Sequence, residues 1–333
     1  MSDVNLPSNF TVMELTSHDY GVAVNIMLLD DGYGGHILVD TGFPDTWGEL
    51  HQLIKREMGA GGRIGQIILT HLHPDHCGSS GKAVENLGAE LSYHRDEDLI
   101  RYYVAELLDN RPSWVPENIL EALRKGMAPV LSTPRPSIYV GDGLHFGDGS
   151  WELVHTPGHT PGHVCLFNRE TATLISGDHL LPEETSNIPY LPVPGYNPLK
   201  LYLKSLDRIL KLRPRIAVPS HGRPFTNIQD RVAQLFTHHR RRLRETAEAI
   251  SSNEQTPVSI ASHITWSRGR FEELSPIDKW LAILETMAHL EFLVSIGFAW
   301  RMDGAQPIYQ PGDLTWERVE DALARILDKP SQV

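Results

Sequence analysis

The feature that most constrains this chain is the segment Thr70–Gly78, which reads THLHPDHCG and directly follows the apolar run Ile67–Leu69. Such a run is typical of a buried strand. Four side chains of the metal-ligand type occupy six positions of the segment: His71, His73, Asp75 and His76. Imidazole and carboxylate are ligands that divalent metals such as zinc prefer. Side chains two apart along an extended chain share a side, so the segment predicts two neighbouring metal ions at a strand end.

Two ions need more ligands than one loop offers, and three later segments supply them. In each, a short β-prone run ends at a turn of small residues that carries one ligand-type side chain. The turn Thr156–Thr160 carries His159, the turn Ser176–His179 carries Asp178, and the turn Pro219–Gly222 carries His221. The preceding runs are 151–155, 172–175 and 215–218. These ligands are therefore expected at three separate strand ends.

The four motifs together resemble those of the metallo-beta-lactamase superfamily, αββα-sandwich hydrolases that include glyoxalase II. The matching patterns are H-x-H-x-D-H, T-P-G-H, S-G-D and S-H-G, in the order of the family and each after a strand. The alternative is a chance grouping of polar loop residues, since the chain has 17 histidines. All four motifs in order favour the metal interpretation over any one of them alone.

The resemblance implies a residue-by-residue assignment of the ligands. His71, His73 and His159 would bind a first ion, and Asp75, His76 and His221 would bind a second, with Asp178 bridging the two. Asp40 lies in a D-T-G turn whose Asp supports the metal loop in this family. The other interpretation of Asp40 is a cap for a helix that begins near Asp45. His163 and His179 are the best candidates to contact the ligands from behind.

Composition and charge limit the partners and the location. The chain has 333 residues with 41% hydrophobic residues, enough for one large core and a smaller one. A formal net charge of -12 argues against general affinity for nucleic acid or anionic membrane. The sequence shows neither a signal-peptide pattern nor an apolar run of 18 residues, so a cytoplasmic location without a membrane partner is expected. Two cysteines give no reason to expect a disulfide.

Two regions are candidates to shape a substrate pocket. A helical insertion at about 94–139 contains Tyr102 and Tyr103, and a Pro-rich loop at 188–198 contains Tyr190 and Tyr196. The resemblance places the insertion beside the metal site. Ordinary packing is the alternative for the first two tyrosines, and a simple spacer is the alternative for the loop. A tyrosine of the loop would donate a hydrogen bond to an oxyanion.

The chain changes character after His221, which suggests a catalytic domain over 1–228 and a second domain over 229–333. Helical patterns at 227–251, 258–266 and 276–296 precede two strand-like runs, 298–302 and 307–309, and a last helix at 314–327. This order resembles a winged-helix domain attached to one branch of the superfamily. The basic run from His238 to Arg244 lies on the first helix and not at the recognition position, so a packing or dimerisation module is favoured over a nucleic-acid reader.

Chemistry follows from the implied metal pair. Two ions about 3.5 to 4 Å apart lower the pKa of a bridging water toward about 7, and the resulting hydroxide attacks a carbonyl carbon. Asp75 and Asp178 are the predicted catalytic residues, because they orient this nucleophile and can accept its proton. Zn²⁺ is the predicted metal, and the ligands also suit Fe or Mn.

The sequence narrows the substrate by departures from family patterns. The glutathione-binding pattern of glyoxalase II and the added motifs of superfamily nucleases are absent, and position 73 is His where flavodiiron proteins have Glu. A small-molecule ester, thioester or lactone is therefore the predicted substrate class. The alternative function is a metal-dependent endoribonuclease that holds RNA with the winged helix. A purely structural metal site is the weakest interpretation, because this ligand set leaves room for water.

Overall fold

The computed structural model describes residues 4–59, 61–251 and 255–328. The chain divides into two compact units, of which the first contains residues 1–102, 126–186 and 212–228. The second contains residues 103–125, 187–211 and 229–333. A boundary at 228 is shared with the sequence prediction, whereas 103–125 and 187–211 join the second unit. Residues 1–3 and 329–333, at the ends of the predicted domains, lie outside the described residues.

The first unit contains a six-stranded sheet in the order β1-β2-β3-β4-β5-β6. Strands β1 (Phe10–Thr16), β2 (Ala23–Asp30) and β3 (His36–Val39) form the expected antiparallel meander. Strands β4 (Ile64–Ile68), β5 (Glu90–His94) and β6 (Ile138–Val140) continue the sheet in parallel. The metal-ligand segment begins directly beyond β4, whose end is buried.

A second, five-stranded sheet carries the other three ligand turns. Its order is β11-β10-β9-β8-β7. The bounds are His145–Phe146 for β7, Trp151–His155 for β8, Val164–Asn168 for β9, Thr173–Gly177 for β10 and Ile216–Pro219 for β11. Only the β10–β11 pair is parallel. His159, Asp178 and His221 follow β8, β10 and β11, as the sequence predicts.

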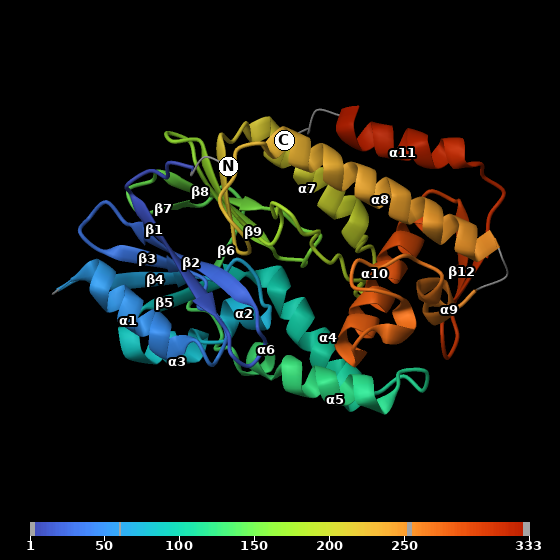
Figure 1. Ribbon diagram of the computed structural model, residues 1–333, viewed down its shortest axis with the longest axis horizontal. Coiled ribbons are helices and arrows are strands. Elements are labelled where there is room, and N and C mark those ends of the chain that lie inside the picture. The colour runs from blue at the N-terminus through green and yellow to red at the C-terminus, as the bar shows by residue number, and fades with distance from the viewer. Residues whose placement is uncertain (1–3, 60, 252–254, 329–333) are drawn as a thin grey trace. The chain divides into compact units, whose positions relative to one another are not determined.

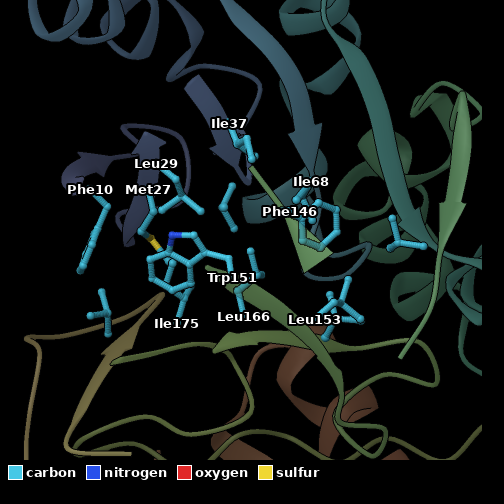
Figure 2. Close-up of a cluster of buried hydrophobic side chains, with 14 residues drawn as sticks. Phe10, Met27, Leu29, Ile37, Ile68, Phe146, Trp151, Leu153, Leu166 and Ile175 are labelled. Atoms are coloured by element: carbon cyan, nitrogen blue, oxygen red, sulfur yellow. The ribbon is translucent and has the colours of Figure 1, made fainter. Parts of the chain in front are cut away.

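The two sheets share one apolar core. Figure 2 shows side chains of the first sheet, among them Phe10 and Met27, in a cluster with Trp151 and Ile175 of the second. The rings of Phe10 and Trp151 meet edge to face, with centroids 5.7 Å apart. Burial of such side chains gives the largest favourable contribution to folding. The sandwich therefore holds the strand ends, and with them the ligand turns, at fixed positions.

Short helices complete the first unit (Figure 1). They are α1 (Trp47–Met58), α2 (Pro74–Cys77), α3 (Ser80–Leu87), the 3₁₀ turn η1 (Arg95–Glu97), the start of α4 (Asp98–Asp109) and α6 (Ala128–Ser132). Helices α1 and α3 pack against the first sheet. Neither α2 nor α6 is predicted from the sequence, and both are shorter than two helical turns.

The second unit is mainly helical and ends in a hairpin and a last helix (Figure 1). Besides the rest of α4 it contains α5 (Glu117–Gly126), α7 (Pro198–Leu212), α8 (Ile228–Ser251), α9 (Pro257–Ser262), η2 (Phe271–Glu273), α10 (Pro276–Ser295), β12 (Ala299–Met302), β13 (Ile308–Pro311) and α11 (Trp316–Asp328). Strands β12 and β13 pair antiparallel, in agreement with the predicted hairpin. Among the described residues no helix is long and apolar enough to cross a membrane.

Candidate metal centre

The ligand segment changes conformation in its middle. His73 is extended and serves as the N-cap of α2, which Pro74 begins. His71 and His73 therefore lie on one side of extended chain, as expected from their spacing. Asp75 and His76 lie instead on the first turn of a helix. The second pair is therefore set by a helical turn and not by strand alternation.

Three imidazole nitrogens and one carboxylate converge in a first set. His71 Nε2 lies 3.0 Å from His73 Nδ1 and 3.2 Å from His159 Nε2. His159 Nε2 is also 3.0 Å from His73 Nδ1. Asp178 Oδ2 lies 3.6 Å from His159 Nε2 and 3.9 Å from His71 Nε2. All four ligand atoms fall within 4.8 Å of one another.

A second set shares Asp178 with the first. His221 Nε2 lies 3.0 Å from Asp75 Oδ2, and His76 Nε2 lies 3.3 Å from the same oxygen. The other oxygen of Asp178, Oδ1, is 3.4 Å from both His76 Nε2 and His221 Nε2. Each oxygen of Asp178 thus faces one set. The structure brings together all seven residues that the sequence predicts as ligands.

The donor atoms fit metal ions better than they fit hydrogen bonds. Zinc held tetrahedrally, 2.0–2.1 Å from each nitrogen, needs about 3.3 Å between ligand atoms, close to the spacing in the first set. Three nitrogens in mutual contact cannot each find a proton to share, because neutral imidazole has one N–H. In the described part of the chain, the buried atoms His76 Nε2 and Asp178 Oδ1 have no hydrogen-bond partner. Buried polar atoms without partners are rare unless a ligand satisfies them.

Residues behind the ligands fix which nitrogen faces the centre. His76 Nδ1 donates to Asp40 Oδ2 at 2.8 Å, and His221 Nδ1 donates to the carbonyl of Ala23 at 2.6 Å. Asp40 also accepts hydrogen bonds from the N–H and hydroxyl of Thr70. Such contacts leave each Nε2 with its lone pair directed at the metal. Asp40 therefore contacts the segment that carries the metal ligands. It does not cap α1, whose N-cap residue is Thr46.

Burial and charge divide the ligands into two electrostatic groups. Burial and neighbouring imidazoles hold the pKa of His71 far below its usual range and lower that of His73 to about 3. Burial also lowers the pKa of His221, but Asp178 and Asp75 outweigh it and raise the value to about 9. Asp75, Asp178 and Asp40 raise the pKa of His76 in the same way. His71 and His73 are thus neutral near pH 7, whereas the protonated rings of His76 and His221 balance the charges of Asp75 and Asp178.

His163 and Gly177 bring the bridging carboxylate into place. His163 is fully buried, and its Nε2 accepts a hydrogen bond from the backbone N–H of Asp178 at 3.2 Å. The preceding Gly177 has a φ of 52°, and a Cβ there would lie 2.6 Å from that same nitrogen. Only glycine fits this close approach. His179 is buried too, with its ring 5.8 Å from that of His163.

A third group of potential ligands has the wrong geometry for a metal. His94, Asp96 and His155 lie near one another. The two rings stack with centroids 4.1 Å apart and an interplanar angle of 12°. Imidazole lone pairs lie in the ring plane, so stacked rings cannot direct both at one ion. We therefore assign no metal to this group.

The four candidate pocket tyrosines lie in different parts of the chain. Tyr102 belongs to the first unit and is 58% exposed, with the Arg135 guanidinium 5.7 Å from its ring. Tyr103, Tyr190 and Tyr196 belong to the second unit. Tyr190 is buried, and its hydroxyl accepts a hydrogen bond from Arg301 at 2.8 Å. The roles given to these tyrosines remain predictions.

Comparison with known proteins decides the family. The profile of the metallo-beta-lactamase superfamily matches residues 19–221, more than half of the chain. The chain belongs to this superfamily. The match contains the whole ligand constellation, and the mixed α/β sandwich agrees with it. The chain is accordingly a hydrolase of this superfamily, with His/Asp clusters that can hold metal ions.

Individual relatives resemble the chain at moderate identity. It is 27% identical to a probable metallo-hydrolase of Bacillus subtilis over 69% of this chain and 75% of that protein. It is 29% identical to the acyl-coenzyme A thioesterase MBLAC2 of Gallus gallus over 63% of this chain and 75% of that protein. A beta-lactamase domain protein of Burkholderia ambifaria superposes with a TM-score of 0.79 at 26% identity, covering 93% of this chain and 94% of that one.

Proposed function

We propose that this protein is a dinuclear-metal thioesterase, which hydrolyses a small acyl thioester to a carboxylic acid and a thiol. The supporting observation is the shared carboxylate of Asp178, each oxygen of which faces a separate set of ligand atoms. His71, His73 and His159 would hold the first ion, and Asp75, His76 and His221 the second. Zinc is the proposed metal, since neutral imidazole and carboxylate suit it.

Two ions held by these residues would lower the pKa of a bound water toward about 7 and polarise the substrate carbonyl. The side chains supply orientation and a proton acceptor. Asp75 Oδ2 lies 3.0 Å from His221 Nε2 and 3.3 Å from His76 Nε2, so this carboxylate already points at the second ligand set. The second acceptor is Asp178, whose Oδ1 has no hydrogen-bond partner among the described residues. Either carboxylate can take the proton of the attacking water.

The thioester preference rests on two relatives. The MBLAC2 enzyme is named an acyl-coenzyme A thioesterase, and a relative from Aspergillus fumigatus is named an atrochrysone carboxyl ACP thioesterase. The latter is 24% identical over 76% of this chain and 65% of that protein. Both names describe hydrolysis of an acyl group linked through sulfur. Esters and lactones would pass through the same tetrahedral geometry, so they serve as comparison substrates.

The C-terminal unit is proposed to be a winged-helix module that packs and does not read nucleic acid. Its order is α8, α9, α10, the β12–β13 hairpin and α11. Twelve of the 20 residues of α10, the third helix, are buried. A recognition helix has to present its side chains to a groove, and a helix buried to this extent has few left to present.

The test is release of thiol from acyl-coenzyme A by protein loaded with zinc, with lactone, ester and beta-lactam substrates measured in parallel. We expect the rate of thiol release to fall by at least about a thousandfold in Asp178→Ala, because this substitution removes a residue that acts together with the other groups of the catalytic centre. Asp45→Ala is the matched control, since among the described residues Asp45 accepts hydrogen bonds from Ser17, His18 and Asp19 and from none of the metal ligands. Wild-type protein that carries metal but releases no thiol, or an Asp178→Ala variant with full turnover, would overturn the proposal.

A further inference from the structure

A buried carboxylate outside the ligand sets links the two loops that carry the first set. Glu97 is the last residue of η1, and its side chain is fully buried. Its Oε2 accepts a hydrogen bond from the N–H of Leu72 at 2.6 Å. Its Oε1 accepts from the N–H of Gly162 at 2.8 Å and from the hydroxyl of Thr160 at 2.5 Å. Leu72 lies between two ligands, and Thr160 follows the third.

Burial of the Glu97 carboxylate costs more free energy than is expected for a side chain with a purely structural role. No cation pairs with it in the described part of the chain, and a buried charge without a cation is stabilised only by its hydrogen bonds. Burial raises the pKa of this carboxyl to about 7, although all three hydrogen bonds act to lower it. Close packing reaches the backbone as well, because a Cβ at Gly162 would lie 2.7 Å from the N–H nitrogen of Glu97.

The donors explain why a carboxylate is required here. The N–H groups of Leu72 and Gly162 can only donate, and they point at different oxygens of Glu97. Only a carboxylate accepts on both atoms. In a glutamine of the same shape, one of the two positions becomes an NH₂ group that faces a backbone N–H. Replacement by glutamine therefore breaks the link on one side.

We propose that Glu97 is a positioning residue of the first ligand set, which it holds in shape for metal by fixing the distance between the His71–His73 loop and the His159 turn. The three nitrogens of that set lie 3.0–3.2 Å apart. A preformed site binds more tightly, because less conformational freedom is lost on binding. This inference rests on the proposed function, since it concerns the same metal centre.

The test compares Glu97→Gln with wild type in zinc affinity, set by a buffered chelator and read as ions per chain. We expect the first ion to bind about 10- to 100-fold more weakly in the variant, while the second keeps its affinity. At low free zinc kcat falls, and excess zinc restores most of it. A merely structural role would lower the melting temperature without changing zinc affinity and without rescue.

The matched control is Glu285→Gln. Glu285 is also a buried carboxylate, but it lies on α10 and receives its hydrogen bond from Asn187 at 2.9 Å. It should lose stability and keep the wild-type zinc affinity. Wild-type zinc affinity in a folded Glu97→Gln protein would overturn the proposal.

If Glu97→Gln does not fold, a second variant tests the positioning role of Glu97. Thr160→Val removes one donor and keeps both backbone hydrogen bonds to Glu97. We expect a smaller loss of zinc affinity, of about two- to tenfold, and unchanged affinity would overturn the proposal. Failure of the proposed function is distinct, because wild-type protein itself would then release no thiol although zinc is bound.

Discussion

At the scale of single residues, Asp40 contacts both a metal ligand and the segment that carries it. It is buried, has a φ of 65° and accepts hydrogen bonds from both His76 and Thr70. A non-glycine residue in this backbone region costs about 1–2 kcal/mol, and such strain concentrates at functional sites. The carboxylate keeps the proton on His76 Nδ1, so that Nε2 is free to bind a metal.

We therefore expect Asp40→Asn to weaken metal binding by about 10- to 100-fold with little change in fold. Its amide can keep the hydrogen bond from Thr70 but then presents NH₂ to His76 Nδ1, which favours the tautomer with the proton on Nε2. Ions per chain measured at fixed free zinc check this expectation, with Asp45→Asn as the control. A variant that keeps full zinc occupancy at nanomolar free zinc would remove the role of Asp40.

Metal binding at the two ligand sets should depend on pH to different extents. In the metal-free protein the pKa of His221 is raised from 6.5 to about 9. The ion pair of His221 therefore stabilises the fold fully below about pH 6.5, and this contribution is lost as the pH rises through about 9. Metal binds only the neutral ring, so a proton must leave. The pKa of His73, at about 3, imposes no such requirement near neutral pH.

The pH dependence of zinc binding can be measured in two variants, each of which keeps only one ligand set. His159→Ala retains the second set, and its zinc affinity should rise at least about tenfold per pH unit between pH 6 and pH 8. His221→Ala retains the first set, and its affinity should be nearly constant over that range. Calorimetric titrations at three pH values give both slopes. Equal slopes in the two variants would contradict the electrostatic division of the centre.

The ligand motifs, and with them Asp40 and His163 as supporting residues, can be recognised in the sequence, whereas Glu97 cannot. His71, His159 and His221 lie in short local motifs, each readable from a few consecutive residues. Glu97 lies in no such motif, because its partners are mainly backbone N–H groups from loops 25 and 65 positions away. Side chains that bind backbone atoms leave no pattern of residue types. The signal available in the sequence is only an acidic residue near the start of the predicted helical insertion.

At the scale of elements, strands were predicted better than short helices. Strand β8 has the predicted bounds, Trp151–His155, because its alternating apolar residues face a continuous core. Helices α2 and α6 have four and five residues. Such pieces show no period, and tertiary contacts decide them. This is why the ligand loop was expected to be extended throughout, whereas half of it is helical.

The turn after β10 offers a test of how tightly an element end fits the centre. Gly177→Ala puts a Cβ 2.6 Å from His163 Nε2 and 3.3 Å from Thr70 Cβ, at a φ of 52°. Gly88→Ala is the matched control, since Gly88 has a φ of 65° and nothing within 4 Å of the added atom. We expect each substitution to lower the free energy of unfolding by about 1–2 kcal/mol, because alanine is strained in this backbone conformation.

Only Gly177→Ala should lose a further ~1–3 kcal/mol from overpacking, together with metal and turnover, because Asp178 shifts. Urea denaturation and ions per chain measure the two effects. Equal losses of stability in both variants, with metal retained, would contradict the close packing of this turn against His163.

At the scale of the whole molecule, the order of the elements can be predicted from the sequence, whereas their division between the two units cannot. Segments 103–125 and 187–211 interrupt the first unit and join the second. Their apolar faces predict burial without identifying the surface that buries them. For this reason three of the four candidate pocket tyrosines lie in the second unit. Their positions in the sequence do not show which unit they belong to.

The charge of the whole chain bears on the remaining alternative, RNA cleavage. Its net charge is -12, and Arg240, Arg241 and Arg244 of α8 already have carboxylate partners within the second unit. Arg240 and Arg244 contact Glu320 at 2.6 and 3.8 Å, and Arg241 lies 3.9 Å from Glu245. Phosphate binding would have to displace these partners and overcome repulsion from the rest of the surface.

We therefore expect wild-type protein to show no salt-sensitive binding of single-stranded RNA at about 0.15 M salt. The Arg240→Ala, Arg241→Ala, Arg244→Ala triple variant should keep full thioester hydrolysis. It should lose little stability, because exposed ion pairs contribute about 0–1 kcal/mol each. Fluorescence anisotropy with labelled RNA and the thiol-release assay measure both. Binding by the wild type that weakens with salt and disappears in the triple variant would instead make the helix a phosphate-binding surface and favour a nuclease.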